Sequence, residues 1–225
     1  MMVFSELILA KNHQYCIINK PAGVPLSKDK TGDTALIDLA EIYFKQPMFV
    51  VHRIDRPVSG VVILAKNQKS AAYFSQLFHD KKIEKEYLAL IEGSQFTGSG
   101  ELQHFISPKI SAGNKSRIIE DTEMEHNAET SFTILGNTDK YSIILLKPHT
   151  GRHHQLRAQL ASTMSPIKGD VKYGARRGNK DRSIYLHAYR IRFPHPVSGE
   201  EMIYVAPPPK DVLWDLTSPL IEIIN

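Results

Sequence analysis

The alternation of apolar and polar positions divides most of the chain into short strands. Runs rich in Val, Ile, Leu and aromatic residues, bounded by Gly, Pro or polar turns, predict β-structure. In residues 186–193, Tyr189, Ile191 and Phe193 alternate with polar positions and are expected to share one buried face. The predicted strands span residues 7–9, 15–19, 60–66, 85–93, 98–105, 116–119, 129–134, 141–147, 186–193 and 202–206.

Helical spacing is confined to a few segments. Apolar residues recur every three or four positions in residues 34–44 and again in 152–162, and Asn67 is a good N-cap for a helix that ends near residue 77 or 79. One last helical turn is expected at 212–216, and the polar segment 107–127 is expected to be the least ordered. Since strands and helices do not alternate regularly, the pattern predicts an α+β fold with a largely antiparallel sheet. We expect residues 1–225 to form a single domain.

The amino-acid composition limits which kinds of protein and which kinds of site are possible. The 225 residues are 42% hydrophobic, which is enough for a sizeable core, and the single cysteine, Cys16, excludes an intramolecular disulfide and a cysteine-based zinc site. The first residues do not show the basic and apolar regions of a signal peptide. No apolar run approaches the roughly 20 residues that span a bilayer. A cytoplasmic protein without a membrane partner is the expectation.

The charge is unevenly distributed, although the net charge is only +4. Residues 147–195 hold 11 Lys and Arg against two acids, whereas the remainder holds 17 basic residues against 22 acids. This asymmetry favours contact with a polyanion through the later third of the chain, with a solvated basic face as the alternative.

Residues 50–66, VVHRIDRPVSGVVILAK, contain the most suggestive polar turn. Pro57 cannot donate a ladder hydrogen bond and pushes Arg56 toward extended geometry, so the turn is expected between two strands. Asp55 then lies between two guanidiniums, which favour its ionised form. Such a carboxylate suits a nucleophile or general base, although an Asp in a turn often only caps backbone N–H groups.

A second polar segment is PHTGRHHQLR, residues 148–157. Its glycine permits a tight turn before a helix, whose N-terminus would present Arg152, His153, Gln155 and Arg157 to an anion such as phosphate. One of these arginines could instead pair with a buried carboxylate, because a guanidinium is always charged and binds bidentately.

A metal site is the rival interpretation of His149, His153 and His154. Adjacent histidines on a helix point in different directions, and no acid or cysteine lies close by in the sequence. We therefore do not expect a metal.

The segment GDVKYG, residues 169–174, precedes a basic loop at 175–182. Its Lys172 and Tyr173 could contact the backbone and sugar of a nucleic acid, and Asp170 could equally well only brace the turn. His187, in LHA at 186–188, is expected to be structural.

Taken in order, these segments resemble the RluA-type pseudouridine synthases. Each motif alone is of weak to moderate specificity, HRIDR followed by SG is the most specific, and the ordered set covers most of the chain. The matching segments are NKPAGVP at 19–25, HRIDRPVSG at 52–60, KEYLALIEG at 85–93, TGRHHQLR at 150–157, GDVKYG at 169–174 and LHAYRIRFPHP at 186–196.

The resemblance implies a mixed, mostly antiparallel sheet with flanking helices and a central basic cleft. It also implies isomerisation of uridine in RNA to pseudouridine without a metal or organic cofactor. Asp55 is then the nucleophile, Tyr87 stacks on the target base, and Arg157 pairs with Asp55 and keeps it ionised. Arg53 fills the space left when the base turns out. The expected RNA-binding residues are Arg53, Arg56, Arg152, His154, Lys172, Arg176 and Arg177.

The chain also departs from the family pattern. Ile54 replaces the commoner Leu, and Val58 replaces the commoner Thr and so removes a hydroxyl. The first motif comes almost at once, so the small N-terminal RNA-binding domain of many relatives is expected to be absent. A catalytically idle RNA-binding protein is the alternative, and a metal-dependent hydrolase is a weaker one. The substrate is expected to be tRNA or rRNA, and the protein a monomer.

Overall fold

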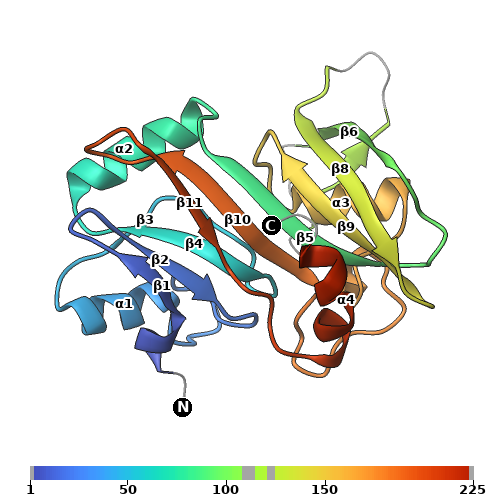
Figure 1. The fold of residues 1–225 in the computed structure, drawn as a ribbon, viewed down its shortest axis with the longest axis horizontal. Coiled ribbons are helices and arrows are strands. Elements are labelled where there is room, and N and C mark those ends of the chain that lie inside the picture. Colours follow the sequence, from blue (N-terminus) through green and yellow to red (C-terminus); the bar gives the residue numbers. More distant parts are fainter. Residues whose placement is uncertain (1–2, 108–114, 121–124, 223–225) are drawn as a thin grey trace. The chain divides into compact units, whose positions relative to one another are not determined.

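The computed structural model describes residues 3–107, 115–120 and 125–222 (Figure 1). The chain forms two compact units. Unit 1 consists of Met1–Lys85 and His187–Pro209, and unit 2 consists of Glu86–Leu186 and Lys210–Asn225.

Unit 1 is built on a mixed sheet that joins the start of the chain to a segment more than a hundred residues later. The blue to cyan strands lie beside the orange and red ones in Figure 1. The order is β1-β2-β4-β10, with β11 paired to β10 and β3 paired to β4; of these pairs, all within the described ranges, only β4–β10 is parallel. The strands are β1 (Ile8–Lys11), β2 (Tyr15–Lys20), β3 (Phe49–Val50), β4 (Ser59–Ala65), β10 (Leu186–Pro194) and β11 (Glu201–Val205).

The core of unit 1 follows from the apolar runs of these strands. Every residue of β4 is buried, as expected for a central strand covered on both faces. Tyr15, Phe74 and Phe193 meet edge to face at centroid distances of 5.2–5.6 Å, a favoured aromatic geometry. Two helices belong to this unit, α1 (Leu36–Phe44) and α2 (Gln68–His79), after a short 3₁₀ turn η1 (Phe4–Leu7).

Unit 2 is built on an antiparallel sheet. Its strands lie in the order β5-β9-β8-β6-β7, and every recorded pair is antiparallel. The strands are β5 (Glu84–Glu92), whose first two residues are counted in unit 1, β6 (Ser99–Ile106), β7 (Ile118–Ile119), β8 (Ala128–Asn137) and β9 (Tyr141–Pro148). Two helices, α3 (Gln155–Thr163) and α4 (Val212–Glu222), and the 3₁₀ turn η2 (Val171–Tyr173) complete it.

The mixed, mostly antiparallel sheet with flanking helices confirms the predicted fold class. Asn67 caps α2 as expected, because its side-chain oxygen accepts a hydrogen bond from the Ser70 N–H at 2.8 Å. The single turn predicted at 212–216 is wrong: α4 runs on through Pro219, because Trp214, Thr217 and Ile221 bury one face. The strand β3 was not predicted from the sequence. The predicted disorder at 107–127 falls largely on residues 108–114 and 121–124, which lie outside the described residues.

Within the described ranges, none of the helices combines the length and the apolar character needed to cross a membrane.

A buried histidine links three segments of unit 1. His187 Nε2 donates to the Ala206 carbonyl at 2.9 Å, so neutral His187 accepts at Nδ1 from the Ser59 hydroxyl at 2.8 Å. Burial lowers the pKa of His187 to about 4. This arrangement agrees with the structural role expected from the sequence.

His187 is therefore expected to sensitise the fold to acid. Because its folded-state pKa lies below the ordinary value of about 6.5, the unfolded chain takes up the proton first as the pH falls. Between pH 7.5 and pH 5 this linkage removes about 2 kcal/mol from the free energy of unfolding. Urea denaturation at both pH values should show a flatter pH dependence for His187→Asn. Equal pH dependence in the two proteins would contradict the neutral, buried state.

Candidate active site

Asp55 lies in a tight turn between β3 and β4. The Val58 N–H donates to the Asp55 carbonyl at 3.0 Å and closes the turn. Ile54 and Val58 are buried at 7% and 2% exposure, whereas Arg53 is exposed and Asp55 is partly buried. The two apolar side chains thus anchor the turn in the core of unit 1 and leave the carboxylate at its edge. The prediction of a turn between two strands is confirmed.

The turn is tied to the neighbouring loop by a lysine that the sequence analysis did not single out. Lys20 is fully buried, and its Nζ donates to the carbonyls of Pro21, Val24 and Arg56 at 3.0, 2.9 and 3.1 Å. Burial lowers the pKa of Lys20 to about 7, and the negative charge of Asp55 acts in the opposite direction. The ammonium therefore both fixes the backbone after Asp55 and contributes positive potential to its surroundings.

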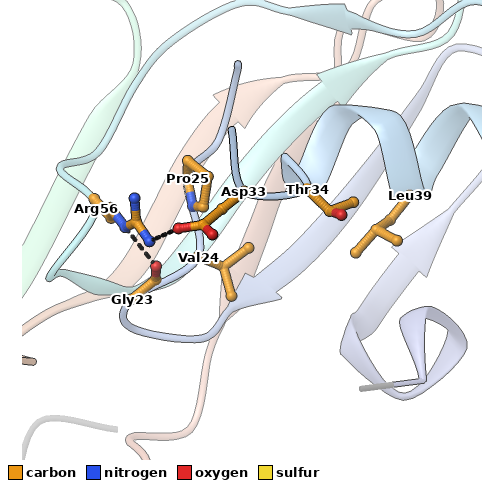
Figure 2. Close-up of a pocket in the computed structure, with 7 residues that line it drawn as sticks. All are labelled: Gly23, Val24, Pro25, Asp33, Thr34, Leu39 and Arg56. Carbon is orange, nitrogen blue, oxygen red and sulfur yellow. Dashed lines mark hydrogen bonds and ion pairs between the residues drawn. The ribbon is translucent and has the colours of Figure 1, made fainter. Parts of the chain in front are cut away.

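Arg56 is held by a second loop (Figure 2). Its Nε donates to the Gly23 carbonyl at 2.7 Å, its Nη1 contacts Asp29 and Thr31 at 3.2 and 2.8 Å, and its Nη2 pairs with Asp33. A pocket of about 350 Å³ lies beside it, lined by Gly23, Val24, Pro25, Asp33, Thr34, Leu39 and Arg56. Arg56 therefore organises this loop, and its contact with RNA stays a prediction.

Tyr87 and Arg157 belong to unit 2. Tyr87 lies on β5, opposite Leu146 of β9, and is partly buried. Arg157 lies on α3, where its Nε and Nη2 contact the two carboxylate oxygens of Asp170 at 2.6 and 2.8 Å. The side chains of this pair are 5% and 1% exposed. The predicted pairing of Arg157 with Asp55 and the stacking role of Tyr87 stay predictions.

Asp170 and Tyr173 form the rest of the site around Arg157. The guanidinium carbon lies 5.0 Å from the centre of the Tyr173 ring, close enough for a cation–π interaction. Asp170 immediately precedes the 3₁₀ turn η2 and Tyr173 is its last residue, so their i, i+3 spacing directs both side chains toward Arg157. The sequence left open whether Asp170 only braces the turn of GDVKYG. In the structure its carboxylate holds the guanidinium of Arg157.

The residues at the N-terminus of α3 are packed against other side chains. His154 precedes the helix with φ 51°, is buried, and places Nδ1 3.0 Å from the Tyr173 hydroxyl. Its ring stacks on His153 at 3.8 Å. Gln155 is also buried and accepts from the Arg152 N–H at 3.0 Å. Of the RNA-binding residues predicted here, only Arg152 is exposed, and its Nε donates to the Asn127 carbonyl at 3.0 Å.

The predicted basic loop is exposed. Lys172, Arg176 and Arg177 all have exposed side chains, with Lys180 and Arg182 close by in the sequence. Such a group offers several cations to a polyanion without a desolvation penalty. Their contact with RNA stays a prediction.

The three histidines of the metal interpretation have other partners. His149 Nε2 lies 2.6 Å from the Ser131 hydroxyl, and His153 Nδ1 lies 2.9 Å from the Ser116 hydroxyl. In the part of the chain that the structure describes, no three His, Cys, Asp or Glu side chains are grouped as a metal ion would require.

Removing the carboxylate of Asp170 is expected to destabilise the protein strongly. The variant Asp170→Asn leaves the buried Arg157 charge without its bidentate partner, which typically costs about 3–5 kcal/mol. Urea denaturation of wild type and variant measures the loss. The double variant Asp170→Leu/Arg157→Met removes both charges and should lose less than Asp170→Asn alone. A single variant as stable as wild type would show that the pair is not needed for folding.

Comparison with known proteins gives the family. Residues 14–162 match the family model described as RNA pseudouridylate synthase. The chain is 30% identical over 213 residues to a tRNA pseudouridine synthase C of Haemophilus ducreyi, covering 84% of this chain and 85% of that protein. It is 30% identical over 217 residues to a ribosomal large subunit pseudouridine synthase C of Buchnera aphidicola, covering 92% and 68%.

Two further likenesses concern length and fold. The chain spans 65% of an uncharacterised RNA pseudouridine synthase of Mycoplasma pneumoniae, with 31% identity over 205 residues and 88% of this chain covered. A solved human structure, RNA pseudouridylate synthase domain containing 4, shares the fold with a TM-score of 0.76 at 23% identity, covering 97% of this chain and 94% of that one. With two thirds of its residues matched by the family model, the chain belongs to the RNA pseudouridylate synthase family.

Proposed function

We propose that this enzyme isomerises specific uridines of tRNA or rRNA to pseudouridine, with Asp55 as nucleophile. The observation that carries the proposal is the HRIDR turn of a family member, with its carboxylate at the edge of a turn anchored by Ile54 and Val58. The reaction breaks the bond between N1 of uracil and C1′ of ribose and joins C1′ to C5. The proton lost from C5 balances the one gained at N1, so no co-reactant is consumed.

The residues of this chain suit the separate needs of that reaction. Asp55 attacks the sugar or the ring, or removes a sugar proton. We propose that Tyr87 stacks on the uracil and keeps it from escaping while the ring turns, and that Arg157 pairs with Asp55 and keeps it ionised. Turning a base out of a helix costs a few kcal/mol. Arg53, which is exposed and carries a planar guanidinium, is proposed to refill the stack.

The basic residues are proposed to hold the RNA backbone. These are Arg53, Arg56, Arg152, His154, Lys172, Arg176 and Arg177, and we propose that residues 1–225 work as one catalytic domain and as a monomer. The relatives named above include one that acts on tRNA and one on the large ribosomal subunit, so both RNA classes remain in the proposal. Since such RNAs function in the cytoplasm, we propose that the protein acts there.

The rival function, catalytically idle RNA binding, rested on the basic later third of the chain, which an active enzyme needs equally, and on the departure at Val58. Val58 is 2% exposed and lies in the apolar core beneath the turn, where its methyl groups pack as a hydroxyl would not. No observation favours the idle protein.

The proposal is tested by mapping pseudouridines in total RNA from cells with and without the gene. We expect at least one uridine of tRNA or rRNA to lose its modification in the deletion strain and to regain it when the wild-type gene is restored. An unchanged map would overturn the proposal.

A further inference from the structure

Within the described part of the chain, the side chain of Lys85 forms no ion pair, although its two neighbours in β5 do. It is the second residue of β5, and its side chain is partly buried. Its neighbours Glu84 and Glu86 both have partners, since Glu84 lies 3.5 Å from Arg192 and Glu86 lies 2.9 Å from Lys147. Among the described residues, the side chain of Lys85 has no hydrogen-bond or ion-pair partner.

Partial burial makes the charged form of Lys85 energetically unfavourable. Burial alone lowers its pKa, and no carboxylate offsets the effect. Its charge also adds to the lowering of the pKa of His52, for which burial is the larger cause, so the ammonium lies within electrostatic reach of the HRIDR turn. A partly desolvated charge without a partner destabilises the free protein. Ionisable groups perturbed in this way cluster at functional sites.

The pleat of β5 sets the direction of the side chain. Successive residues of a strand point to opposite faces, so Lys85 and Tyr87 share one face, and the two paired glutamates share the other. The two Cα atoms on the shared face lie about 6.6 Å apart along the strand. This spacing, a property of one continuous strand, allows a single nucleotide to meet both side chains.

We propose that Lys85 binds the phosphate group next to the nucleotide whose base stacks on Tyr87. This inference rests on the proposed function, which supplies the stacked base. A Lys ammonium binds phosphate as a compact point charge with three donors. The bound phosphate would neutralise Lys85 where the free protein does not. The exposed cations of residues 172–182 carry no desolvation penalty and serve the backbone more generally.

The test compares two uncharged variants, Lys85→Met and Lys85→Gln, with Lys85→Arg, which keeps the charge. Lys69→Met is the matched control, because Lys69 is an exposed lysine on α2 of unit 1. The probe is a transcript that spans the uridine identified by the mapping experiment. Its dissociation constant is measured by filter binding over a range of salt concentrations, in an Asp55→Asn background so that the RNA is not converted.

Lys85→Met and Lys85→Gln should each weaken binding about tenfold at 0.1 M salt. The slope of log affinity against log salt should fall by about 0.7–0.9, the value of one phosphate contact. Lys85→Arg should keep most of the wild-type salt slope. Lys69→Met should change neither the dissociation constant nor the salt slope. Both uncharged variants are expected to remain folded, because they remove a desolvated charge, and circular dichroism checks this.

The possible failures are distinguishable. If Asp55→Asn is inactive but Lys85→Met and Lys85→Gln bind with an unchanged salt slope, only the phosphate assignment is overturned. If Lys85→Met with Asp55 intact loses turnover while the salt slope is unchanged, the phosphate assignment is likewise overturned, because that result would assign Lys85 to the chemistry. If no uridine maps to this enzyme, or if Asp55→Asn keeps normal turnover, the proposed function fails and this inference fails with it.

Discussion

The variant Asp55→Asn is expected to form no measurable pseudouridine. Asparagine keeps the size and shape of the side chain but cannot act as a nucleophile or accept a proton as a carboxylate does. Loss of an essential nucleophile typically lowers kcat by about 10⁴-fold or more. Single-turnover conversion of the mapped transcript, read by mass spectrometry of its nucleosides, measures the effect.

Two further measurements make that result specific. The free energy of unfolding and the affinity for the transcript should stay close to those of wild type, because the anchors Ile54 and Val58 are unchanged. Asp139→Asn is the control, since Asp139 is an exposed carboxylate in the turn between β8 and β9. It should convert the transcript at the wild-type rate. Normal turnover by Asp55→Asn would remove Asp55 from the chemistry.

Gly60→Ala is expected to destabilise the protein by about 2–5 kcal/mol, through strain at positive φ and overpacking. Gly60 follows the HRIDRPVS segment on β4, has φ 116°, and lies opposite Ala188 in the parallel β4–β10 pair. A Cβ atom there would lie 2.2 Å from the Ala188 carbonyl oxygen and 2.5 Å from its nitrogen. Because both atoms belong to the backbone, the clash cannot be relieved by rotating a side chain.

The control separates the clash from the backbone strain. Gly199 also has positive φ, 72°, but nothing lies within 4 Å of the Cβ position, so Gly199→Ala should lose only about 1–2 kcal/mol. Urea denaturation of both variants gives the difference. Equal losses would mean that β10 moves aside without penalty, contrary to the close register of β4 and β10.

Local patterns predicted much of the fold because they report local physics. The cap at Asn67 and the alternation of Tyr189, Ile191 and Phe193 needed no knowledge of distant segments, and both are found as expected. The helix at the end of the chain was underestimated. Pro219 lies inside α4, where the buried face around Trp214 outweighs the local effect of the proline.

The site was harder to predict, because its contacts join residues that are distant in the sequence. The three carbonyls that hold the Lys20 ammonium include that of Arg56, 36 positions away, and no pattern in NKPAGVP indicates it. Asp170 is separated from Arg157 by 13 residues. Its i, i+3 spacing with Tyr173 was a usable signal. The burial of His154 could have been suspected only from its position beside an apolar helix face.

The division of the chain into units has a consequence for synthesis. Residues 86–186 are contiguous, whereas the sheet of unit 1 needs β10 and β11, which follow them. At about 5–20 residues per second, a ribosome takes roughly 6–25 s to proceed from residue 85 to residue 209. Throughout that interval the nascent β4 has an open edge where β10 will pair, and an open edge invites pairing with other chains. Early chaperone binding is therefore expected, and a polypeptide that terminates before β10 should aggregate instead of folding.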